Sequence, residues 1–187
     1  MFGWGRKKKE AAVVEFVVDR MAPMFKLLAS RLDDGPPRLA LDEELPPRLL
    51  GDPYFVGFVS VAVSIFVNVS SKWKASFELK GLASYSAFRL AFPSEVSSLA
   101  SMSEIVQRAR GAPECLAGAR AADVILGVCF GAIGEDEPEV VAARIAVAKM
   151  PESIREMMVA RTDNDLLIYE LMEELFYRPL IRKHKAA

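Results

Sequence analysis

The spacing of apolar residues predicts a helix near the start of the chain. Between residues 10 and 32, Val, Met, Phe and Leu recur three or four positions apart, and most charged side chains lie elsewhere on the helical wheel. Pro23 falls inside this amphipathic pattern and should kink the helix or begin a second piece. The run DDGPP at 33–37 should end it, and four prolines make residues 33–52 an extended connector.

The 19 residues from 53 to 71 carry no charge and fit two kinds of element. From Val59 onwards, Val and Ile alternate with smaller or polar residues, as in a β-strand. At the helical period, however, the small and polar residues share one face: Gly57, Ser60, Ser64, Asn68 and Ser71. Asp52 followed by Pro53 is also a favourable helix start, and strands seldom exceed about ten residues. We therefore favour a helix.

The remaining segments are mostly helical in pattern. Residues 72–92 fit a small β-hairpin by their alternation, and equally a helix by the spacing of Tyr85, Phe88 and Phe92. Further helices are predicted with Pro, Gly or capping residues at their ends, over 93–111, 114–130, 139–150, 151–161 and from 162 onwards. Pro179 should disrupt the last helix.

These segments together predict a mainly α protein, a compact array of about six to seven helices. A small β-hairpin within residues 55–92 is the alternative that would change this fold class. The organisation is a single helical domain over 10–178 with a Pro-rich connector at 33–52, flanked by a basic and aromatic N-terminal tip at 1–9 and a basic C-terminal tail at 179–187.

The composition excludes several classes of protein. Counting the 11 Gly in place of the 4 Tyr gives an apolar share of about 56%, above the range typical of a soluble domain. A charge-rich disordered chain is thereby excluded. The net charge of −1 is the sum of two basic ends and an acidic body, because residues 10–174 hold 16 basic and 25 acidic residues. We do not expect nucleic acid as a partner.

The first nine residues combine aromatic and basic side chains in a way that suits an anionic membrane surface. Aromatic rings enter the interfacial layer while cations meet phosphates. The candidate membrane-docking residues are Phe2, Trp4, Arg6, Lys7, Lys8 and Lys9. The other interpretation of these residues is a solubilising tail, which we favour over docking. Charged residues interrupt the apolar stretch that follows, so we expect no signal peptide and a cytoplasmic location. If the tip docks, the protein lies peripherally at the inner face of a membrane.

The sequence offers no constellation for catalysis. His184 lies in the run RKHK, where we expect it to be solvated, and Cys115 and Cys129 are expected to be reduced and to act as small apolar residues. The carboxylates near the last helix suit capping and an exposed helix face rather than a metal site: Asp163, Asp165, Glu170, Glu173 and Glu174. We therefore predict no catalytic residues, no cofactor and no metal.

The uncharged run at 53–71 carries two further hypotheses. Its length reaches that of a membrane span, with Tyr54 and Trp73 flanking it like interfacial aromatics and Lys72 and Lys74 following. Its polar face is also a candidate pocket lining or helix-packing face, formed by Gly57, Ser60, Ser64 and Asn68. Close packing against a neighbouring helix is the favoured interpretation of the two.

Three functions follow, in this order. The first is a non-enzymatic cytoplasmic interaction or assembly protein whose partner is another protein or a second copy of the chain. The second is a membrane-associated protein that docks by residues 1–9 or spans at 53–71. The third is a helical small-molecule-binding protein or enzyme with a site lined by Ser60, Ser64 and Asn68.

Overall fold

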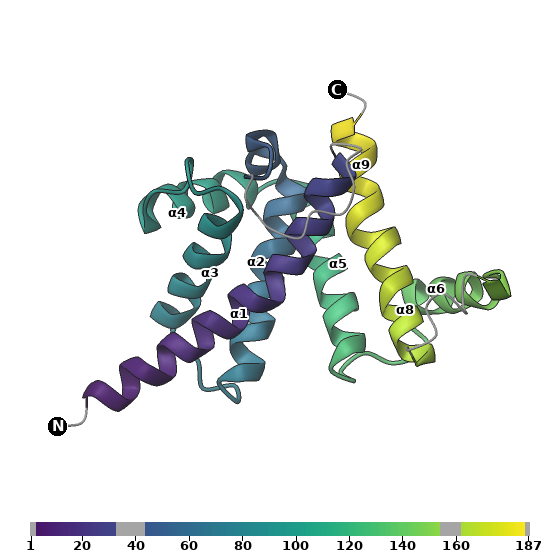
Figure 1. Ribbon diagram of the computed structural model, residues 1–187, viewed down its shortest axis with the longest axis horizontal. Coiled ribbons are helices and arrows are strands. Elements are labelled where there is room, and N and C mark those ends of the chain that lie inside the picture. The colour runs from purple at the N-terminus through teal and green to yellow at the C-terminus, as the bar shows by residue number, and fades with distance from the viewer. Residues whose placement is uncertain (1–2, 33–43, 154–161, 186–187) are drawn as a thin grey trace.

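The computed structural model describes residues 3–32, 44–153 and 162–185, with the side chains of 3–6 and 163 outside the description. The elements in chain order are α1 (Gly3–Leu32), η1 (Pro47–Gly51), α2 (Pro53–Ser70), α3 (Phe77–Ala91), α4 (Leu99–Ala109), α5 (Pro113–Cys129), α6 (Pro138–Ala148), α8 (Asp163–Met172), η2 (Glu173–Tyr177) and α9 (Arg178–Lys185). Figure 1 shows α2 inside the array, with α1 crossing in front of it from the N-terminus at lower left.

The prediction of a compact, mainly α array of six to seven helices is confirmed. Elements α8, η2 and α9 form one continuous helix, which gives seven helices in the part of the chain described. Residues 72–92 contain α3 rather than a hairpin, and no strand occurs in the described residues. The predicted helix at 151–161 and most of the connector at 33–52 fall largely outside the described residues; within that connector, Pro47–Gly51 is a 3-10 turn.

Capping chemistry fixes the starts of two helices as the sequence indicates. The Asp52 side chain accepts a hydrogen bond of 2.9 Å from the Tyr54 backbone N–H at the start of α2. Thr162 and Asp165 exchange side-chain and backbone hydrogen bonds in a capping box at the start of α8. Pro23 does not divide the first helix, because α1 continues through it to Leu32.

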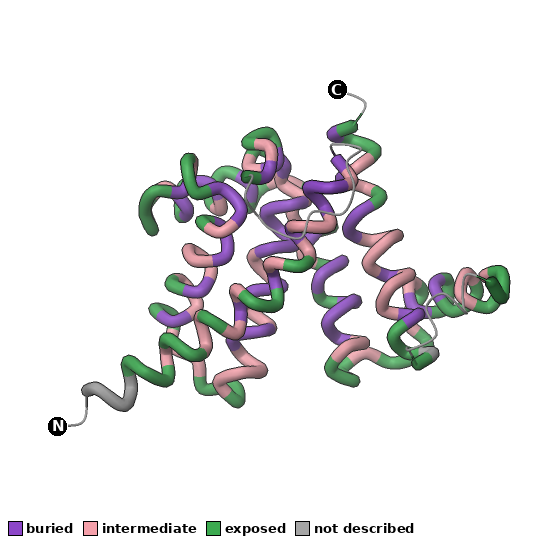
Figure 2. The backbone as a smooth tube through the Cα atoms, in the orientation of Figure 1, coloured by how far each residue is buried: buried purple, intermediate pink, exposed green. Residues whose placement is uncertain are grey.

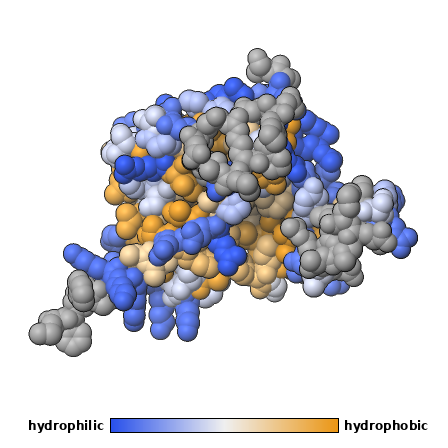
Figure 3. All heavy atoms as spheres, in the orientation of Figure 1, coloured by the Kyte–Doolittle hydropathy of each residue, from blue (hydrophilic) through white to orange (hydrophobic). Residues whose placement is uncertain are grey.

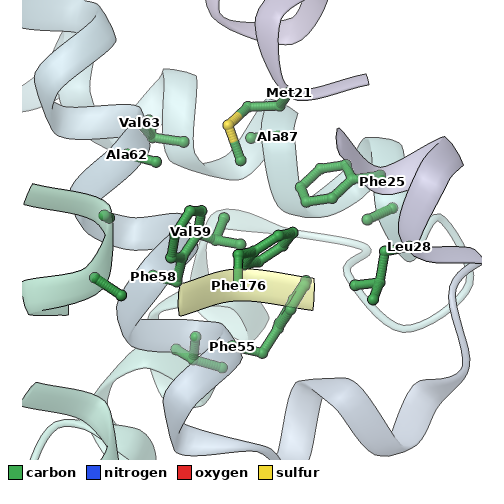
Figure 4. Packing of buried hydrophobic residues seen from close by; sticks show 14 of the residues in the cluster. Met21, Phe25, Leu28, Phe55, Phe58, Val59, Ala62, Val63, Ala87 and Phe176 are labelled. Carbon is green, nitrogen blue, oxygen red and sulfur yellow. The ribbon is translucent and has the colours of Figure 1, made fainter. Parts of the chain in front are cut away.

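Helix α2 organises the core. It packs against α1, α3, α4 and α5, and Figure 2 shows buried positions along most of its length. Aromatic side chains fill the space between the helices, with the ring of Phe58 4.1 Å from that of Phe176 and the ring of Phe55 6.1 Å from that of Phe25. These rings lie together with Met21 and Val59 in Figure 4. Aromatic pairs at these distances add to the stabilisation from apolar burial.

Two glycines allow α2 and α5 to approach at backbone distance. A Cβ added at Gly57 would lie 2.1 Å from the carbonyl oxygen of Cys115, and one added at Gly118 would lie 2.0 Å from that of Tyr54. Each glycine therefore receives the backbone of the opposite helix, where a side chain would force the helices apart. Gly131 ends this region at φ +67°, a conformation that favours glycine.

Candidate membrane-docking surface

The N-terminal end of α1 projects from the helical array at lower left in Figure 1. Lys7, Lys8 and Lys9 lie there on consecutive positions and are all exposed. Figure 3 shows hydrophilic residues gathered at this end of the molecule. Of the other predicted docking residues, Phe2 lies outside the described residues, and Trp4 and Arg6 lie in the first turns of α1 with undescribed side chains. Their docking role stays a prediction.

A loop at residues 71–76 lies beside this end of α1 and presents two large rings. Trp73 is 73% exposed, and Phe77, the first residue of α3, is 88% exposed. Both Lys72 and Trp73 have left-handed backbone conformations, at φ +53° and +63°. The Trp73 N–H donates a 2.7 Å hydrogen bond to the Asn68 carbonyl, which fixes the turn against the end of α2.

A groove of about 1140 Å³ separates α1 from this loop. Its polar lining includes Lys9 from α1, Lys72 and Lys74 from the loop, and Ser71 and Ser76. Its apolar lining comes from α1 and the start of α3. We define the docking surface as residues 7–9 of α1, residues 71–77 and the groove between them.

The charge of the docking surface is predominantly positive. Lys72 and Lys74 are exposed, as are the three lysines of α1, and the described residues contain no ion pair to any of these five. Glu10 lies in the groove lining and Glu78 follows Phe77, so two carboxylates accompany the lysines. Such a surface attracts anions without being uniformly basic.

On the polar face of α2, Gly57 packs against a neighbouring helix. Gly57 contacts α5 at Cys115, as the helix-packing interpretation requires. Ser64 and Asn68 are half-buried, and the Asn68 carbonyl accepts the Trp73 N–H. The Ser60 Oγ is buried and has no hydrogen-bond partner among the described residues. These residues do not line the groove, nor a second pocket of about 500 Å³ between η1 and α4.

His184 is not solvated, so the sequence-based expectation for it is wrong. The imidazole is 8% exposed, and its Nε2 donates a 2.6 Å hydrogen bond to the Oδ2 of Asp52, which is itself 2% exposed. Lys183 Nζ lies 3.1 Å from the same oxygen. The reason is that α9 continues the last helix and turns His184 and Leu180 inward, whereas the sequence reads locally as a tail.

Asp52 therefore joins the start of α2 to the C-terminal helix α9. Burial raises the pKa of its carboxyl, but the hydrogen bonds from His184 and Lys183 outweigh burial and hold the pKa below its ordinary value. The neighbouring Tyr54 hydroxyl donates to the Leu175 carbonyl, and burial raises the pKa of that tyrosine to about 12. We call Asp52, Tyr54, Leu175, Lys183 and His184 the C-terminal anchor.

Pro179 explains why the Leu175 carbonyl is available. In a regular helix that carbonyl would accept from the N–H four residues later, which proline lacks. The last helix accommodates the proline through the π-turn of η2, in which the Arg178 N–H bonds to the Glu173 carbonyl. The proline thus does not end the helix, and Tyr54 supplies the missing donor.

The sequence did not indicate the C-terminal anchor. It indicated Lys7–Lys9 and residues 72–74 of the docking surface but not the groove between them. Lys72, Trp73 and Lys74 were signalled as flanks of an apolar run, while Phe77 carried no signal of its own. Within the described residues, no group of three or more His, Cys, Asp or Glu side chains is arranged to hold a metal ion.

Comparison with known proteins adds no family to these observations. No protein-family model, curated protein or solved structure matches the chain. Function is therefore inferred from the surface and its chemistry alone.

Proposed function

We propose that the protein docks peripherally on anionic phospholipid membranes through its N-terminal end. The observation that carries this proposal is the exposure of Lys7–Lys9 on α1 and of Trp73 and Phe77 at the α2–α3 connection, which meet at a groove lined by Lys9, Lys72 and Lys74. The natural target is the inner face of the cytoplasmic membrane, where anionic lipids attract polybasic segments.

The two kinds of side chain provide two separate contributions to binding. A lysine near an anionic leaflet contributes about 1 kcal/mol, and the effect falls off within a Debye length. Aromatic rings favour the interfacial layer, where one part of the ring meets acyl chain and the other meets water. Stable anchoring generally takes two such signals, and this surface carries both.

Surface docking accounts for the apolar run better than spanning does. Within the described residues, α2 is the one helix whose length and apolar composition suit a bilayer crossing, and half of it is buried within the protein. It contacts four other helices and approaches α5 at backbone distance. Moving α2 into lipid would expose the core that it organises and the buried Asp52 at its start.

Vesicle flotation tests this proposal. The full chain should float with vesicles of phosphatidylcholine and phosphatidylglycerol, should stay in the aqueous fraction with phosphatidylcholine alone, and should be released by salt. The double variant Lys7→Gln/Lys8→Gln should bind about tenfold or more weakly. The matched control is Arg110→Gln/Lys149→Gln, which removes two exposed cations elsewhere. Equal loss in both variants, or no flotation at all, would refute docking by this end.

Self-association is the second candidate, and one observation on α6 favours it. Val141 and Ile145 lie one helical turn apart and are 41% and 50% exposed, while Val140 and Ala143 face inward. A second copy covering this pair would remove apolar surface from water. Light scattering over a concentration series should then show a dimer that Val141→Lys/Ile145→Lys converts to monomer; a monomer at every concentration removes this candidate.

A further inference from the structure

We propose that the groove between α1 and residues 71–77 is a phospholipid headgroup site: Lys9, Lys72 and Lys74 take the lipid phosphate while Trp73 and Phe77 enter the interfacial layer. This inference rests on the proposed function and deepens it, because it assigns the docking to a formed site rather than to charge alone. The ligand class is an anionic glycerophospholipid in a bilayer.

The backbone of the loop is the first observation in its favour. Lys72 and Trp73 occupy consecutive left-handed conformations, which glycine ordinarily fills at a helix end. The turn is nevertheless fixed by hydrogen bonds from the N–H groups of Trp73 and Lys74 to carbonyls of Asn68 and Ser71. A tryptophan held in this way and left 73% exposed adds nothing to the core. Strained residues of this kind concentrate at functional sites.

The lining of the groove is the second observation. Lys9, Lys72 and Lys74 and the hydroxyls of Ser71 and Ser76 supply donors to the lining, as a phosphodiester requires. The same lining also contains apolar side chains, from Val13, Phe16 and Leu79. A groove that combines cations with apolar surface suits a headgroup joined to its glycerol backbone.

The volume of the groove and the carboxylate of Glu10 in its lining limit the choice of ligand. A groove of about 1140 Å³ exceeds what a free phosphate would fill and is open enough to receive a lipid at the membrane surface. Glu10 lies in the same lining, so the lining is less positive than its three lysines alone would make it, and a lipid with a single phosphate is the suitable probe. Phosphatidylglycerol has this chemistry.

Tryptophan fluorescence tests the site directly. The chain has two tryptophans, so Trp4→Phe leaves Trp73 as the sole emitter in the otherwise complete protein. With phosphatidylglycerol vesicles, Trp73 emission should shift to shorter wavelength and be quenched by lipids brominated near the headgroup. Glycerol phosphate in solution should leave the emission unchanged. A shift with glycerol phosphate alone would overturn the assignment to a membrane lipid.

Affinity measurements with matched variants complete the test. Trp73→Ala/Phe77→Ala changes no charge and should weaken vesicle binding by at least about tenfold, whereas Leu116→Ala, which shortens an equally exposed apolar side chain on α5, should leave binding unchanged. Lys72→Gln/Lys74→Gln should weaken binding more than Lys7→Gln/Lys8→Gln, although both remove two charges. Circular dichroism checks that each variant is folded.

The outcomes separate this inference from the proposed function. If the protein floats while Trp73 emission stays that of a water-exposed indole, the headgroup site is overturned and peripheral docking stands. If Lys72→Gln/Lys74→Gln and Lys7→Gln/Lys8→Gln weaken vesicle binding equally, binding depends on total charge alone. That result would also overturn the headgroup site. If the protein does not float at all, the proposed function itself fails.

Discussion

The two basic ends of this chain look alike in sequence and differ in structure. Each carries four Lys or Arg residues and no acidic residue. At the N-terminal end, Lys7–Lys9 are exposed on a projecting helix beside a loop with two exposed rings. At the C-terminal end, α9 turns His184 inward onto Asp52, and Lys183 reaches the same carboxylate. The difference is that the C-terminal end contacts the buried carboxylate of Asp52, whereas Lys7–Lys9 form no described ion pair with a carboxylate.

This contrast shows what decides whether a basic segment becomes part of a fold. A buried carboxylate is costly unless cations and hydrogen-bond donors satisfy it, so Asp52 requires the partners that α9 brings. Among the described residues, no buried carboxylate pairs with the lysines of the docking surface, and these lysines are exposed. They are therefore available to an external anion, whereas Lys183 and His184 of the C-terminal anchor bind Asp52.

The largest expected effect comes from removing the acceptor of the C-terminal anchor. Asp52→Ala deletes the cap of α2 and leaves His184 buried without its partner, so the free energy of unfolding should fall by about 2–4 kcal/mol in urea titrations. Asp123→Ala, at an exposed position, should change it by less than about 0.5 kcal/mol. Equal stability of the two variants would contradict the proposed importance of the anchor.

Acid should weaken the same anchor without any mutation. The folded-state pKa of Asp52 is lowered, so the unfolded chain binds this proton more readily than the folded protein. The resulting stability is present above the unfolded-state pKa of about 4 and is lost as pH falls through the lower folded-state pKa. Asp52→Asn should lose less stability over that acid range than the parent protein. Parallel stability curves would count against the ion pair.

The hydrogen bond between Tyr54 and the Leu175 carbonyl should contribute less. Tyr54→Phe leaves that carbonyl without a donor, because Pro179 cannot supply one, and should cost about 1 kcal/mol of unfolding free energy. The control is Tyr85→Phe, which removes two exposed hydrogen bonds, one to the Ser97 carbonyl and one from the Arg89 guanidinium, and should have little effect. A larger loss for Tyr85→Phe would reverse the ranking.

In the docking surface, substitutions that relieve backbone strain should raise the free energy of unfolding rather than lower it. Trp73→Gly relieves a left-handed backbone conformation and should raise the free energy of unfolding by up to about 1 kcal/mol, while weakening binding to anionic vesicles. Lys72→Gly relieves the same kind of strain but keeps the ring. It should therefore stabilise the protein with a smaller loss of binding. Destabilisation by both variants would show that the loop conformation is not strained.

Much of the fold follows from short-range sequence patterns. The spacing of apolar residues predicts α1. Asp52 as N-cap and Pro53 at the first helical position favour a helix over a strand for residues 53–70. Thr162 and Asp165 identify the start of α8 in the same way. Such signals are local, because capping and amphipathicity depend on residues within one or two turns.

The features that sequence reasoning missed are those that depend on distant residues. Asp52 and His184 are 132 positions apart, and nothing near His184 in the chain indicates an acceptor. Pro179 was expected to disrupt the helix because its compensation by Tyr54 comes from another element. Only part of the docking surface was visible, since the groove exists where α1 meets the start of α3.

The length of α1 has a consequence for how a docked molecule would be oriented. From Lys9 in the docking surface to Arg31, the helix extends about 33 Å, and Arg31 pairs with Glu173 at 2.5 Å, two residues before Leu175 of the C-terminal anchor. That reach is several times the screening length of about 8–10 Å in physiological salt. A protein bound to a membrane by its docking surface would leave its opposite end in bulk solution. The lipid charge would be screened there by salt, and soluble molecules could bind that end without contacting the bilayer.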